Sequence, residues 1–294
     1  MFRAARSLVT LILNDLRGVV IRPKTVASLV LVGLTFLLLA WAISQAALIP
    51  VDPESVNPSG LWQRGVNGAF TTLFFGIAPI LLPILPLVIA YDTREWESST
   101  GFLEMSASRP VPRSILAMGK VISLYVITAL PILALWFVGA ILIQLPFGPA
   151  VDRGLLLGSL VSSLLGTALY LVLVLVFMVL WTPSTALALS LLLWALCHVL
   201  SPTALLLTAQ LLLIVPSSVV ISFQASFVDV GSFAGLHQGL LAVFVPAELG
   251  FVVLPSLAMW PALIAAWAAA IGGIPWLIGL VVLFVILFNR LQVS

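Results

Sequence analysis

The sequence has very little charge. Twelve basic and ten acidic residues make up only 7% of its 294 residues, whereas about a quarter of an ordinary soluble domain is charged. Hydrophobic residues account for 62% of the chain, and its mean hydropathy is +1.27. This leaves too little polar material for a separate soluble domain. We therefore predict an all-α polytopic membrane protein in which residues 1–294 form a single transmembrane domain.

Cysteine and histidine are also scarce, which excludes several kinds of chemistry. The single cysteine, Cys197, cannot form an intrachain disulfide or a thiolate metal cluster. The two histidines, His198 and His237, are far apart in the sequence, and no HExxH motif is present. We therefore expect no catalytic, cofactor-binding or metal-binding residues in this chain. The net charge of +2 is small, and we expect no nucleic-acid partner.

A Walker A sequence is absent as well. Gly119-Lys120 has the right dipeptide, but Ser114 stands where the motif needs its first glycine, and Val121 follows the lysine. If the protein uses ATP, a different chain must hydrolyse it.

Long apolar runs are what the sequence has instead. A membrane-spanning helix needs about 20 apolar residues, and six runs meet or approach this: residues 26–49, 67–91, 121–145, 154–181, 184–200 and 262–288. The second run contains Pro79, Pro83 and Pro86, so we predict that it is kinked or partly unwound.

The distribution of basic residues predicts how these spans are oriented, because cytoplasmic loops are enriched in lysine and arginine. An N-terminus in the cytoplasm, with six spans, places ten basic residues inside: Arg3, Arg6, Arg17, Arg22, Lys24, Arg94, Arg109, Arg113, Lys120 and Arg290. Only Arg64 and Arg153 then lie outside. We predict a multi-pass protein of the cell (plasma) membrane with both termini in the cytoplasm. The spans contain few ionisable residues, which argues against an ion-coupled carrier.

Two further segments are not ordinary spans. Residues 1–22 predict an amphipathic helix at the membrane interface, with arginines toward anionic headgroups; the alternative is a cleaved signal peptide. Residues 201–261 are apolar but broken by prolines. We predict re-entrant or short surface helices on the outer side between spans five and six. Two complete spans in this region, making eight in all, are the alternative.

The one long polar stretch is residues 92–120. It contains eight charged residues: Asp92, Arg94, Glu95, Glu97, Glu104, Arg109, Arg113 and Lys120. We predict a loop in water, with a short helix from Thr100 or Gly101 to Ser108. Arg109 precedes a proline and so disfavours helix. The next helix starts near Pro112 and enters the membrane after Lys120. This loop is the best candidate for contact with a soluble partner.

The motifs in this loop resemble a known family. Glu97-x-x-x-Gly101-Phe102-Leu103-Glu104, then Ser108-Arg109-Pro110-Val111-Pro112-Arg113, then Gly119-Lys120 are similar to the first cytoplasmic loop of ABC-2 type transporter permeases. The usual form is close to ExxxGTLE, SRPVSR and a final GK. Phe102 replaces the usual threonine, and Met105-Ser106-Ala107 replace common leucines. Within the family, the likeness is to the permease that serves nitrous-oxide-reductase maturation.

The resemblance implies a function. In such permeases the loop docks on a separate nucleotide-binding ABC ATPase subunit, which carries the ATP and magnesium, and two permeases join two ATPases. The implied coupling residues are Glu97, Gly101, Phe102, Leu103, Glu104, Met105, Arg109, Pro110 and Arg113. The chain would then be the non-catalytic membrane subunit of an exporter, paired with a second copy or a related permease in the lipid bilayer. The apolar spans suggest a lipophilic or amphiphilic cargo, with small molecules and peptides as alternatives. A membrane-embedded enzyme or assembly factor without ATP coupling is the alternative function, and an ordinary solvated loop is the alternative for residues 92–120.

Overall fold

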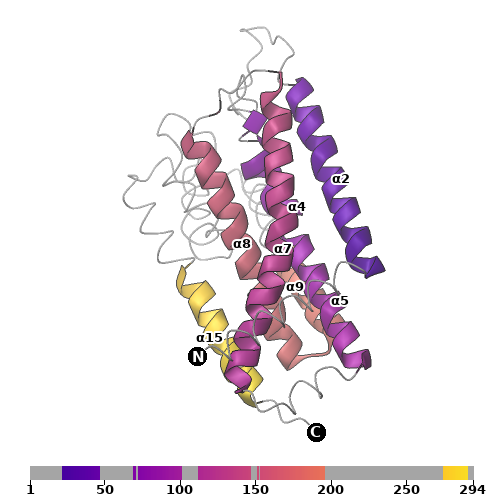
Figure 1. Ribbon diagram of the computed structural model, residues 1–294, viewed down its shortest axis with the longest axis vertical. Coiled ribbons are helices and arrows are strands. Elements are labelled where there is room, and N and C mark those ends of the chain that lie inside the picture. The colour runs from indigo at the N-terminus through magenta and orange to yellow at the C-terminus, as the bar shows by residue number, and fades with distance from the viewer. Residues whose placement is uncertain are drawn as a thin grey trace, which may run out of the picture.

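The described part of the protein is a bundle of helices (Figure 1). The computed structural model describes residues 22–46, 69–70, 72–100, 112–146, 151, 153–195 and 274–290. Within them lie α2 (Pro23–Ala46), the π-helix η2 (Thr72–Ile77), α4 (Ala78–Leu81), α5 (Ile84–Thr100), α7 (Arg113–Gln144), α8 (Arg153–Leu180), α9 (Pro183–Ala195) and α15 (Ile274–Arg290).

Three of these helices are long and apolar enough to cross a membrane. They cover Pro23–Gln45, Arg113–Gln144 and Ser159–Leu180. The α9 and α15 helices are apolar but shorter. The predicted helical, membrane-like character is therefore confirmed, while the count of six spans stays a prediction.

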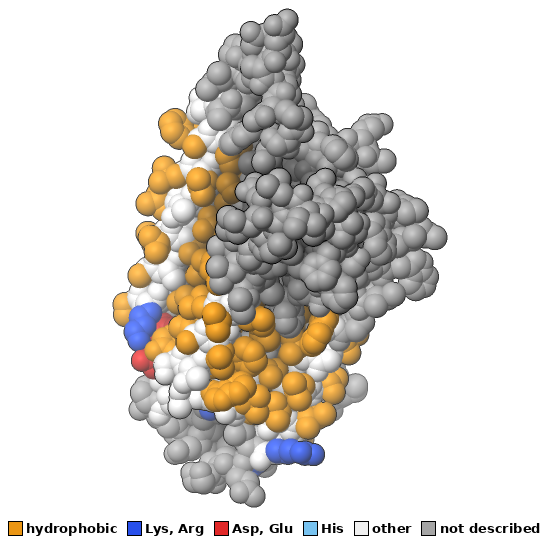
Figure 2. Space-filling model, turned by 180° about the vertical axis from the view of Figure 1, so that it is seen from behind, with side chains coloured by type: hydrophobic (Ala, Val, Ile, Leu, Met, Phe, Trp, Pro, Cys, Tyr) orange, Lys and Arg blue, Asp and Glu red, His pale blue; other side chains and the backbone are white. Residues whose placement is uncertain are grey.

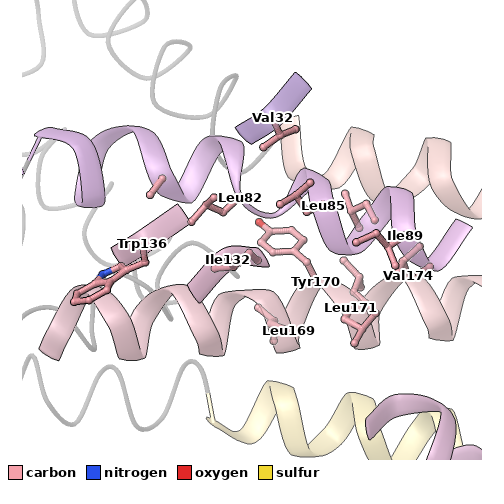
Figure 3. Packing of buried hydrophobic residues seen from close by; sticks show 14 of the residues in the cluster. Val32, Leu82, Leu85, Ile89, Ile132, Trp136, Leu169, Tyr170, Leu171 and Val174 are labelled. Atoms are coloured by element: carbon pink, nitrogen blue, oxygen red, sulfur yellow. The ribbon is translucent and has the colours of Figure 1, made fainter. Parts of the chain in front are cut away.

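The core of the bundle is built around α8, which packs against α5, α7, α9 and α15. All residues from Leu169 to Val176 are buried. Figure 3 shows Tyr170 and Val174 of α8 close to Leu85 and Ile89 of α5. The outer faces of the helices carry many exposed apolar side chains, and orange side chains cover much of the described surface in Figure 2. Apolar side chains on both the inside and the outside are what a helix surrounded by lipid requires.

The second predicted span is broken at its prolines, as expected. Its described part includes helical residues 69–70, the π-helix η2 and the single turn α4, and is interrupted by a turn at Leu82–Pro83 before α5 starts. Proline removes a backbone donor and its ring collides with the preceding turn, so three prolines in eight residues prevent a continuous α-helix.

Several predicted features lie outside the described residues. They are the interfacial helix up to residue 21, the outer segment 201–261, and Cys197, His198 and His237.

Candidate functional site

Charged side chains of the described helices gather at one end of the bundle. This charged end is where α2 and α7 begin and where α5 and α15 end. Arg113 Nη1 donates a hydrogen bond to the carbonyl oxygen of Asn289 at 3.5 Å, which ties the start of α7 to the end of α15. On the face in Figure 2, acidic and basic side chains appear only toward the lower part of the described surface. By contrast, Arg153 begins α8 at the opposite end (Figure 1).

A buried hydrogen bond joins the start of α2 to α5. Thr25 Oγ1 donates to Asp92 Oδ2 at 2.6 Å, and both side chains are buried. A carboxylate removed from water needs such donors, because burying it without them is costly. The contact therefore fixes where α2 meets α5.

Two more contacts surround this hydrogen bond. Lys24 Nζ lies 2.6 Å from Glu95 Oε2 in an exposed ion pair. The hydrogen bond from Lys24 holds the pKa of the Glu95 carboxyl below its usual range, while desolvation opposes the shift. Arg22 is buried, and its guanidinium lies 4.7 Å from the centre of the Trp96 ring. Three residues at or just before the start of α2, Arg22, Lys24 and Thr25, thus contact one side of α5.

A second connection joins α5 to α7. Glu97 Oε1 and Lys120 Nζ form an ion pair and a hydrogen bond. The Glu97 side chain is 5% exposed and that of Lys120 is 16% exposed, so the pair is largely shielded from water. In a helix, position 97 lies well away from position 92 around the axis. The α5 helix is therefore held by polar contacts on two different sides, by α2 and by α7.

The loop predicted over residues 92–120 is shorter than expected, because helices extend into it from both ends. Residues 92–100 belong to α5 and residues 113–120 to α7, so both ends of the 92–120 segment are helical. Asp92, Thr93 and Glu97 are buried in the protein, not in water as expected for a loop. The start of the next helix near Pro112 agrees with the prediction, because Pro112 is the N-cap of α7.

The predicted coupling residues divide into two groups. Glu97 and Arg113 are described, and each makes a contact with another helix. The others lie outside the described residues: Gly101, Phe102, Leu103, Glu104, Met105, Arg109 and Pro110. The short helix predicted between residue 100 and Ser108 also falls almost entirely there.

Sequence reasoning did not identify the partners of α5. Thr25 and Asp92 are 67 positions apart, and Lys24 and Glu95 are 71 apart, so no local spacing links them. Glu97 and Lys120 offered a weak signal, since they are oppositely charged and stand at the two ends of the loop motif. Within the described ranges, no group of three or more metal-ligating side chains could hold an ion.

No model of a known protein family matches the chain, and a search of curated proteins finds no similar one.

Proposed function

We propose that this chain is the membrane subunit of an ATP-driven exporter similar to ABC-2 type permeases, coupled to a separate ATPase through residues 92–120. One observation carries the proposal. Glu97 and Lys120, the first and last residues of the loop motif, pair with each other between α5 and α7.

The pair gives the motif a mechanical meaning. The Glu97–Lys120 pair ties the two ends of this segment to each other. Force applied to such a segment reaches α5 and α7 together, and α2 through Thr25 and Asp92. A soluble partner docked on residues 101–111 would therefore act on three helices at once.

The apolar cluster Phe102, Leu103 and Met105 supplies the anchor in this proposal. Aromatic and aliphatic side chains that fill a groove often contribute about 2 kcal/mol or more each to binding. Glu104, Arg109 and Arg113 would orient the partner, and ATP with magnesium would bind to the partner alone. The exported cargo would be lipophilic or amphiphilic, and a second permease would complete the unit.

The test is co-purification with an ATPase that has a Walker A motif and is encoded beside this chain. Phe102→Ala with Leu103→Ala should reduce the amount of ATPase recovered and uncouple hydrolysis from transport. Leu130→Ala, a change at an exposed site inside α7, is the matched control and should retain the ATPase. Failure of the unchanged protein to bind any such ATPase would favour a membrane enzyme or assembly factor instead.

A further inference from the structure

The second predicted span consists of two halves that meet where the helix is interrupted, at the turn Leu82–Pro83. Leu82 N bonds to the carbonyl of Ala78 at 2.9 Å, and Leu85 N bonds to that of Leu82 at 3.1 Å. Pro83 and Pro86 have no N–H group to continue the α-helical pattern across the turn. Figure 3 shows Tyr170 of α8 between Leu82 and Leu85, with its hydroxyl toward the break. The end of α4 and the start of α5, which meet at this turn, both pack against α8.

The half below the break is held by directional contacts. Asp92 accepts from Thr25, and Glu97 pairs with Lys120. Both acids are buried, and a buried carboxylate is stabilised in the protein interior only while such partners stay in place. These contacts allow α5 little movement relative to α2 and α7.

The half above the break is held differently, by rings packed on rings. Phe74 lies 4.4 Å from Phe70, 5.9 Å from Phe36 of α2 and 5.8 Å from Trp136 of α7, measured between ring centres. Dispersion contacts of this kind are weak one by one and impose little directional constraint.

Gly139 of α7 lies where two of these rings, Phe36 and Phe74, contact the helix, and it presents no side chain to them. A Cβ at this position would lie 2.8 Å from Phe36 Cε1 and 3.3 Å from Phe74 Cζ. The Phe36 and Phe74 rings therefore rest directly against the α7 backbone at Gly139, with no side chain between them.

We infer that η2 and α4, residues 72–81, form a hinged segment that swings about Leu82–Pro83, while α5 stays fixed to α2 and α7. The proline break supplies the pivot, and the aromatic contacts supply a surface over which the segment moves. Hinges are commonly a few residues at the ends of elements, and π-helical turns are frequent at functional sites. The inference concerns the chain alone and does not depend on an ATPase partner.

Distances between pairs of spin labels in the purified protein in lipid nanodiscs test this inference. The first pair, Ile80→Cys with Ser98→Cys, spans the break over 18 positions. The matched pair, Ile122→Cys with Ile141→Cys, spans 19 positions of α7 and also contains a proline, Pro131, inside an unbroken helix. Each pair corresponds to about 27–29 Å of helix. Both pairs are made in a Cys197→Ser background.

We expect a broader distance distribution for Ile80–Ser98 than for Ile122–Ile141. Pro83→Ala restores a backbone donor and should remove the excess width, whereas Pro131→Ala should leave the α7 distribution unchanged. Equal widths in the two pairs, or an Ile80–Ser98 width that Pro83→Ala does not change, would overturn the inference. If Pro83→Ala does not fold, the comparison of the two pairs without it decides the question.

Discussion

Glu97, near the end of α5, and Lys120, two turns into α7, form an ion pair that is largely buried although 23 positions separate them. The pair neutralises two charges where the helices leave the apolar core. It also fixes the ends of the chain segment between them, because each residue lies on a helix packed in the bundle.

Removing one member of this pair should destabilise the protein strongly. Lys120→Met leaves the buried Glu97 carboxylate without its cation, which typically costs about 3–5 kcal/mol. Lys24→Met breaks the exposed pair with Glu95 and should cost much less stability, because water screens that pair. Unfolding by sodium dodecyl sulfate in mixed micelles measures both. Equal losses would contradict the different shielding of the two pairs.

Exchanging the two charges should restore most of the lost stability. Glu97→Lys alone and Lys120→Glu alone each place like charges together, whereas the double variant recreates an attractive pair. If the two residues contributed independently, the losses of the single variants would add and the double variant would be the least stable of the three.

The exposed Lys24–Glu95 pair should make stability sensitive to acid. Its hydrogen bond lowers the folded-state pKa of Glu95, so its contribution is fully present above the ordinary glutamate pKa of about 4.3. It is lost as pH falls through the lowered folded-state value. Between about pH 6 and pH 3, the midpoint temperature of thermal unfolding should fall less steeply for Glu95→Gln than for the unchanged protein. Parallel profiles would show that the pair makes no contribution.

Gly139 should tolerate no side chain. Gly139→Ala forces Phe36 to move, since the new Cβ would lie 2.8 Å from the ring, and overpacking of this kind costs about 1–3 kcal/mol. Gly33→Ala is the matched control. Its nearest neighbour, Leu135 Cδ2, would lie at an ordinary 3.5 Å, so the higher helix propensity of alanine should make it neutral or stabilising. A loss at Gly33 as large as that at Gly139 would contradict the packing.

The charged end is predicted to face the cytoplasm. Introduced cysteines at Ser98 and Arg290, in a Cys197→Ser background, should resist an impermeant thiol reagent added to intact cells, while Arg153→Cys should react. Ser98 lies near the end of α5 and Arg290 at the end of α15, both at the charged end, whereas Arg153 begins α8 at the opposite end. The reverse labelling pattern would invert the predicted orientation.

Composition and proline spacing alone were enough to predict the general architecture. Apolar runs of sufficient length predict membrane helices because backbone polar groups must be satisfied within the chain in lipid. The break in the second predicted span follows from Pro79, Pro83 and Pro86 for a similarly local reason, since each proline lacks a backbone donor. The polar stretch near residue 97 was also visible as an unusual concentration of charge.

Only the tertiary structure decided what those charges do. Asp92, Glu97 and Lys120 indicated a loop in water because charged side chains are costly to bury unless they are paired. Their partners lie on other helices, and Thr25 is 67 positions from the acid it contacts. Once such pairs form, the helices can continue through charged residues, so α5 extends to Thr100 and α7 begins at Arg113. Pairing between helices distant in sequence depends on how they pack, and no local pattern carries that information.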